Sequence, residues 1–88
     1  KRQVTTVQSS SVTVSPGQSG YRVAYCPTGY LATGGGHVIA SYTSIAQRAL
    51  ISVYTARPIG TNGYGVGVVN GSNSGLTFNT YVYCLNSN

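Results

Sequence analysis

The amino-acid sequence predicts a small all-β domain. Its segments rich in Val, Thr and Tyr alternate apolar with polar positions, which is typical of strands with one buried side. Clusters of Gly, Pro, Asn and Ser separate these segments and predict turns. The 88 residues suffice for one hydrophobic core, because a chain of this size buries little more than half of its unfolded surface.

The first fifteen residues, KRQVTTVQSSSVTVS, favour extended chain and are expected to form one or two strands. Val12 and Val14 share a parity along the chain, whereas Val4 and Val7 do not. A bulge or break at residues 8–10 is therefore needed if both halves pair with the rest.

Further strands are expected at 21–26, 30–33, 37–43, 50–57, 64–70 and 76–85. Gly34, Gly35 and Gly36 predict a bulge or a close approach of backbones between the second and third of these strands. Pro58 is expected to end the strand at 50–57, because it lacks the N–H that a ladder needs. Residues 44–49, SIAQRA, are the one candidate for a helical turn, and since they are too short for a stable helix we expect a loop.

The strand at 76–85, LTFNTYVYCL, shows the clearest alternation. Side chains two residues apart point to the same side of a strand. The side predicted to face the core carries Leu76, Phe78, Thr80, Val82 and Cys84. The opposite side carries Thr77, Asn79, Tyr81, Tyr83 and Leu85.

Two cysteines, Cys26 and Cys84, are expected to form a disulfide. Small secreted domains compensate for a thin core with such bridges. A bridge here closes most of the chain and is worth about 4 kcal/mol of unfolded-state entropy. The alternative is a pair of free buried thiols in a reducing compartment. A zinc site is not expected, because two Cys and one His fall short of four ligands.

The sequence contains no Asp and no Glu against five Lys and Arg residues, so its formal net charge is +5. Glycoside hydrolysis needs two carboxylates, calcium sites need carboxylate oxygens, and serine triads use an acid to orient the His. We therefore expect no catalytic residues, no metal and no cofactor. The chain is not expected to be an enzyme.

The positive charge predicts anionic partners such as acidic sugars, phosphates or lipopolysaccharide. Nucleic acid is not expected, because the cations are spread along the chain without a basic stripe: Lys1, Arg2, Arg22, Arg48 and Arg57. No apolar run approaches the ~20 residues of a membrane span. The N-terminus lacks a signal-peptide pattern, so we interpret the chain as a mature or excised piece.

Eight tyrosines stand against one Phe and no Trp. Tyrosine offers a flat face for a sugar ring and a hydroxyl that stays hydrated. We expect Tyr81, Tyr83 and Asn79 to form one polar aromatic surface that, with a nearby Arg, contacts saccharide or lipopolysaccharide. The alternative is that these tyrosines occupy ordinary half-buried sheet positions. Tyr21 and Tyr25 form a second pair on one side of their own strand.

Two further side chains are candidates for ligand contacts. Arg48 lies in a polar segment and is expected to contact an anionic group of the ligand. The alternative is that Arg48 only makes the surface more soluble. His37 follows three glycines and is a candidate to donate to a ligand phosphate or to act as a pH-sensitive contact. The alternative is a structural role. The sequon Asn70-Gly71-Ser72 is interpreted as a hairpin turn without a function of its own.

Four motifs follow one order along the chain: CPTGYLATGGG, Arg57-Pro58, NGYGVGVVN and LTFNTYVYC. Over roughly residues 12–85, this order resembles the C-P-x-G-x-x-x-x-G-G-G domains found at the ends of bacterial and phage extracellular proteins. In that family a Trp-centred strand follows the Pro, and a terminal Y-x-x-C closes the bridge. The resemblance implies a small antiparallel β-sandwich closed by one disulfide between Cys26 and Cys84.

The chain departs from the family pattern in two places. Tyr64 stands where a Trp is usual, which makes it a further candidate for ligand contact, and a polar stretch, SYTSIAQRA, follows His37. Among surface proteins, the resemblance implies the variable tip of a conjugative type IV pilus adhesin or the tip of a phage fibre.

The leading hypothesis is an adhesive tip domain at the cell or virion surface that recognises a cell-surface glycan or lipopolysaccharide and belongs to a larger filament or fibre protein. Residues 12–88 are the expected binding domain, and residues 1–11 an N-terminal strand or a linker to the upstream protein. One alternative is a structural module that assembles a filament by pairing with copies of itself. Another is a cationic secreted toxin or inhibitor.

Overall fold

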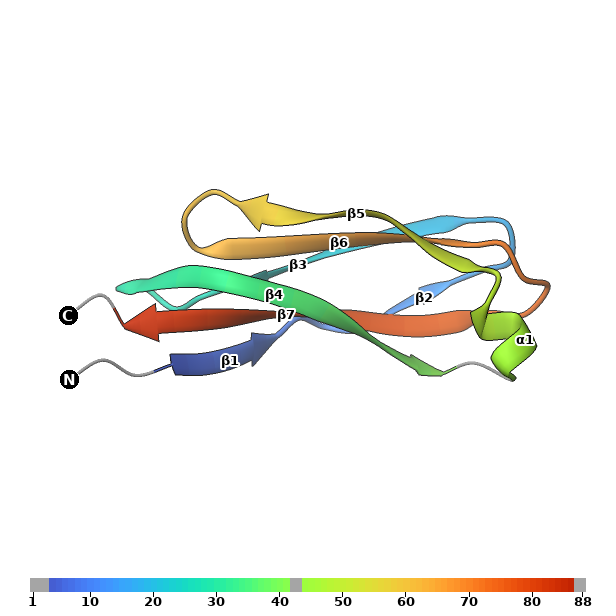
Figure 1. The fold of residues 1–88 in the computed structure, drawn as a ribbon, viewed down its shortest axis with the longest axis horizontal. Helices are drawn as coiled ribbons and strands as arrows, with labels where there is room; N and C mark the ends of the chain where they lie inside the picture. Colours follow the sequence, from blue (N-terminus) through green and yellow to red (C-terminus); the bar gives the residue numbers. More distant parts are fainter. Residues whose placement is uncertain (1–3, 42–43, 87–88) are drawn as a thin grey trace.

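The computed structural model describes residues 4–41 and 44–86, which form seven strands and one helical turn. Figure 1 shows the strands arranged in two facing layers. In chain order the elements are β1 (Val4–Gln8), β2 (Val12–Val14), β3 (Ser19–Tyr25), β4 (Tyr30–Ser41), α1 (Ile45–Arg48), β5 (Ile51–Ile59), β6 (Gly63–Asn70) and β7 (Leu76–Asn86).

The two layers are antiparallel sheets, so the chain is a small β-sandwich. In the four-stranded sheet β7 is central, with β4 along one edge and both β1 and β2 along the other. In the three-stranded sheet β6 lies between β3 and β5. The predicted all-β antiparallel architecture is confirmed.

The core lies between the sheets and is built on the inward side of β7. This side is the one that the alternation predicts, and all of its members are almost fully buried: Leu76, Phe78, Thr80, Val82 and Cys84. They divide into two apolar clusters on either side of Thr80. One cluster contains Phe78 with Val66 and Val68 of β6, and the other contains Val82 with the two cysteines.

The disulfide between Cys26 and Cys84 joins the two sheets. Its sulfur atoms lie 2.09 Å apart, and both cysteines are buried. The bond ties the end of β3 to the central strand of the opposite sheet, as the sequence predicts. It closes a loop with a sequence separation of 58.

The N-terminal strands show the break that the valine parity predicts. β1 and β2 both pair with β7, and residues 9–11 between them belong to neither strand. The backbone N–H of Ser9 donates to the carbonyl of Thr80 at 2.7 Å, and the Thr80 N–H donates to Ser9 Oγ at 2.9 Å. This exchange satisfies the backbone of β7 where the ladder is interrupted.

β4 and β5 differ most clearly from the predicted strands. β4 is continuous from Tyr30 to Ser41, where two short strands separated by glycines were expected. The glycines accompany the predicted bulge, which lies between Ala32 and Gly34, and the ladder with β7 continues beyond it. Pro58 lies inside β5 rather than after it, which is tolerated because β5 is an edge strand.

The expected loop at 44–49 contains the single helical turn α1. The hydroxyl of Ser44 accepts a hydrogen bond from the backbone N–H of Gln47 at 3.1 Å, as an N-cap does. The Gln47 side chain is buried and its amide donates to the carbonyl of Ser74 at 3.0 Å. Packing and hydrogen bonds to a distant turn therefore stabilise a helix that its own length would not.

Candidate functional site

The side of β7 opposite the core carries Tyr81, Tyr83 and Asn79, as the alternation predicts. The two tyrosine rings contact each other edge to face, with centroids 5.4 Å apart and an interplanar angle of 66°. Tyr83 is 41% exposed, and Tyr81 and Asn79 are half-buried. We call the surface around these three residues the Tyr81 surface.

The glycines of β4 form the floor beside these rings. Gly36 is paired with Tyr81 and Gly34 with Tyr83. A methyl group built on Gly36 would lie 2.5 Å from Tyr81 Oη and 2.7 Å from Cζ, so the Tyr81 ring lies across the space that any larger residue would fill. Gly36 is a site residue that sequence reasoning missed. The three successive glycines predict only a bulge or a close approach of backbones, and not a contact with a tyrosine ring.

A polar rim completes the Tyr81 surface on the β1 side. The Asn79 amide nitrogen donates to Gln8 Oε1 at 3.0 Å. Thr6 is paired with Tyr83 on the same side of the sheet. On the β4 side, the exposed Val38 is paired with Asn79, so amide, hydroxyl, aromatic and aliphatic groups share one open face.

The hydroxyl of Tyr81 remains protonated over a wide pH range. Its pKa is raised from the ordinary value near 10, first by a hydrogen bond with Tyr83 and then by the charge of that residue. Partial burial and the phenol of Tyr64 raise the pKa of Tyr81 further. The Tyr81 hydroxyl is therefore neutral, and it can both donate and accept hydrogen bonds.

Tyr64 lies on the inner side of β6, not on the Tyr81 surface. Its ring packs against both core clusters. A methyl group built on Gly35 would lie 2.7 Å from Tyr64 Cγ, so the glycine segment of β4 separates the ring of Tyr64 from that of Tyr81. Tyr64 therefore contributes to the packing between the two sheets.

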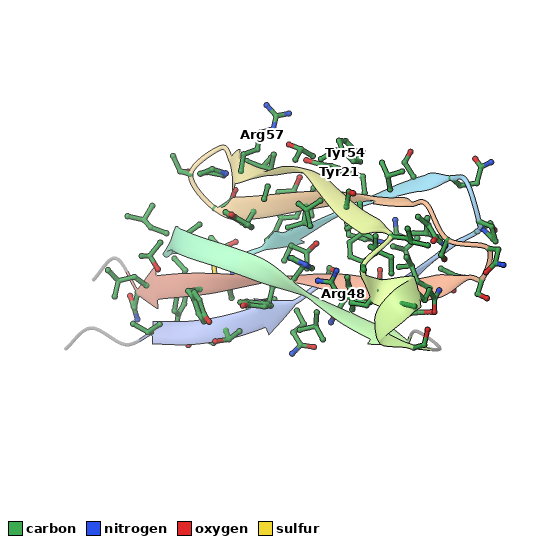
Figure 2. All side chains as sticks on the ribbon, turned by 45° about the vertical axis from the view of Figure 1, so that its right-hand side comes forward. Tyr21, Arg48, Tyr54 and Arg57 are labelled. Carbon is green, nitrogen blue, oxygen red and sulfur yellow. A yellow bond between two sulfur atoms is a disulfide. The ribbon has the colours of Figure 1, made fainter. Side chains whose placement is uncertain are left out.

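The structure places Arg48 within electrostatic range of His37, and His37 does not lie on the Tyr81 surface. His37 is paired with Thr80 and therefore faces inward, where it is half-buried. The pKa of His37 is lowered below 6.5, mainly by burial and also by the charge of Arg48. Figure 2 shows the Arg48 side chain extending from α1 back toward the middle of the strands.

The described residues contain no cluster of three His, Cys, Asp or Glu side chains that could hold a metal ion. They also enclose no pocket. No helix among residues 4–41 and 44–86 is long and apolar enough to cross a membrane.

The Tyr81 surface is thus an open patch of tyrosine rings on a glycine floor with an amide at its edge. Comparison of the chain with protein-family models, with curated protein sequences and with solved structures found no match.

Proposed function

We propose that this chain is an extracellular adhesive domain that recognises a cell-surface saccharide through the Tyr81 surface. The observation that carries the proposal is the edge-to-face pair of Tyr81 and Tyr83 beside the glycine floor. A ring that lies against glycine backbone keeps its outer face open, and such a face stacks on the C–H face of a sugar. The hydroxyls and the Asn79 amide supply hydrogen bonds to sugar hydroxyls.

Two properties of the whole chain support this proposal. The disulfide is favoured in an oxidising compartment, which agrees with display outside the cell on a filament or fibre. The net charge of +5 without any Asp or Glu attracts acidic cell-surface polymers, including lipopolysaccharide. A shallow surface without a pocket suits an extended saccharide more than a small ligand.

A glycan array followed by isothermal titration tests the proposal. Tyr81→Ala and Tyr83→Ala are each expected to weaken binding of the selected glycan by about tenfold, the loss typical of a central contact residue. Tyr81→Phe keeps the ring and is expected to retain most of the affinity. The control is Leu50→Ala, which truncates an exposed side chain outside this surface. Unchanged affinity in both alanine variants would overturn the proposal.

A further inference from the structure

The outer side of the three-stranded sheet carries a second exposed aromatic surface. Tyr21 and Tyr25 come from β3 and Tyr54 from β5. They are 37%, 54% and 55% exposed. We call this patch the Tyr54 surface. It lies on the opposite side of the molecule from the Tyr81 surface, because the two sheets pack with their inner sides together.

Each of these rings lies across one glycine of β6. The glycines occupy alternate positions, 63, 65 and 67, while the residues between them face the core. A methyl group built on Gly67 would lie 2.5 Å from Tyr54 Cζ, and one built on Gly63 would lie 3.0 Å from Tyr25 Cδ1. A methyl group on Gly65 would meet the hydroxyl of Tyr21. The three rings thus lie along one central strand.

The row of three rings is longer than a single sugar unit. From Gly63 to Gly67 the strand advances four residues, which corresponds to about 14 Å at ~3.4 Å per residue. Several sugar units of an extended chain span such a distance. A row of aromatic rings on a rigid central strand is preorganised, so binding costs little side-chain entropy.

A positive charge lies beside the rings. Arg57 is exposed and paired with Gly65, so it shares the outer side of the sheet with Tyr21 and Tyr54. Figure 2 shows Arg57, Tyr21 and Tyr54 on the same side of the molecule. Among the described residues, Arg57 makes no hydrogen bond or ion pair, and the sequence contains no side-chain carboxylate that could pair with it. The Arg57 guanidinium is therefore available to pair with an anionic group of a ligand.

We propose that the Tyr54 surface binds an anionic saccharide chain. Sugar rings stack on the tyrosines, and a carboxylate, sulfate or phosphate of the chain pairs with Arg57. A guanidinium binds such groups through two parallel hydrogen bonds, which makes Arg the side chain suited to this contact. The inference is independent of the Tyr81 surface and holds whether or not that surface binds glycan.

Two other occupants fit this surface less well. A second copy of the chain has no side-chain carboxylate to offer Arg57 and carries the same net charge of +5. A nucleic acid needs a row of cations along its phosphates. The Tyr54 surface has Arg57 alone among the described cations, because Arg22 lies on the inner side of β3 and Arg48 on α1.

The test is titration calorimetry with three probes of matched length: an oligogalacturonide, a dextran sulfate fragment and a neutral dextran. The wild-type chain is expected to bind the two anionic probes more tightly than the neutral one. Arg57→Gln is expected to weaken anionic binding by about tenfold, as loss of a charge-assisted hydrogen bond does. Its matched control, Arg48→Gln, removes the same charge elsewhere and is expected to change affinity less than about twofold.

The tyrosine and glycine variants test the stacking. Tyr21→Ala and Tyr54→Ala are expected to weaken anionic binding, and Gly67→Ala is expected to do the same by tilting the Tyr54 ring without removing any functional group. Thermal unfolding of each variant establishes that the fold is intact. Equal losses in Arg57→Gln and Arg48→Gln, or unchanged affinity in the tyrosine variants, would overturn the proposal. So would tighter binding of a single-stranded oligonucleotide that depends on these residues.

Discussion

Asn70 is fully buried, and its side-chain amide makes four hydrogen bonds. Its nitrogen donates to the carbonyls of Val14 and Ser74 at 3.0 and 2.8 Å. Its oxygen accepts from the backbone N–H of Ser72 at 3.0 Å and from the Ser72 hydroxyl at 2.6 Å. Asn70 therefore organises the turn before β7 and connects it to β2. The Asn70-Gly71-Ser72 sequon therefore has a structural role in the folded chain, because the Asn70 side-chain nitrogen is buried and donates to two carbonyls.

Asn70→Asp is expected to destabilise the fold by about 3 kcal/mol or more at pH 7. A carboxylate cannot donate to the two carbonyls, and its charge would be buried without a partner. Burial raises the pKa of such a carboxyl, so part of the lost stability returns as the pH falls and the group is protonated. Urea unfolding at pH 7 and pH 3 measures both effects.

The matched control is Asn73→Asp, three residues along the same turn at an exposed position. It adds the same charge and is expected to change the free energy of unfolding by less than about 0.5 kcal/mol. Equal destabilisation by the two substitutions would contradict the role assigned to Asn70.

Two neighbouring glycines of β4 are expected to behave differently. A methyl group on Gly35 would meet the backbone carbonyl oxygen of Tyr81 and the ring of Tyr64, which is held between the two core clusters. Gly35→Ala is therefore expected to cost about 1–3 kcal/mol of stability, as overpacking does. A methyl group on Gly36 meets only the outer part of the Tyr81 ring, which can tilt toward solvent. Gly36→Ala should leave stability nearly unchanged and weaken glycan binding.

Unfolding curves and glycan titrations of these two alanine variants check this pair of outcomes. If Gly36→Ala unfolds as readily as Gly35→Ala, then the Tyr81 ring is part of the core and not of an open surface.

Strand β7 was predictable because its alternation is uninterrupted over the whole strand, so the core side and the positions of Tyr81, Tyr83 and Asn79 follow directly. The orientation of His37 was not predictable. Leu31 is paired with Leu85 on the outer side of the sheet, but Thr33 at the bulge is an extra residue. That extra residue reverses the parity of the rest of β4, so His37 faces inward.

The remaining differences also come from contacts between distant parts of the chain. The helical turn at 45–48 depends on Gln47, whose partners lie in the turn before β7. The alternation of Gly63, Gly65 and Gly67 is visible in the sequence. The tyrosines that cover them come from β3 and β5, however, and only the pairing of the strands identifies them.

The molecule is a thin, elongated sandwich with principal extents of 47 × 20 × 17 Å, so its core is small for its length. Its charge composition sets its response to acid. Acid denaturation of most proteins reflects protonation of carboxylates that are paired in the native state. This chain has no Asp or Glu, so apart from the chain ends the only side chain that titrates between pH 3 and 8 is its single His, His37.

Stability is therefore expected to change with acid in one step. Because the pKa of His37 is lowered in the folded state by burial and by Arg48, the unfolded chain binds more protons below pH 6.5. The free energy of unfolding should be highest above pH 6.5, fall as the pH drops through the lowered pKa, and then level off. Urea unfolding between pH 3 and 8 measures this curve.

Two variants assign the step to His37. His37→Gln removes the titrating group, so its curve should be flat across the range. Arg48→Gln removes the smaller cause of the shift, so the pKa of His37 moves part of the way back toward 6.5 and the step shrinks. The chemical shift of the single imidazole follows that pKa directly by NMR. A continued loss of stability toward pH 3 in His37→Gln would mean that repulsion among the remaining positive charges, and not His37, governs the response to acid.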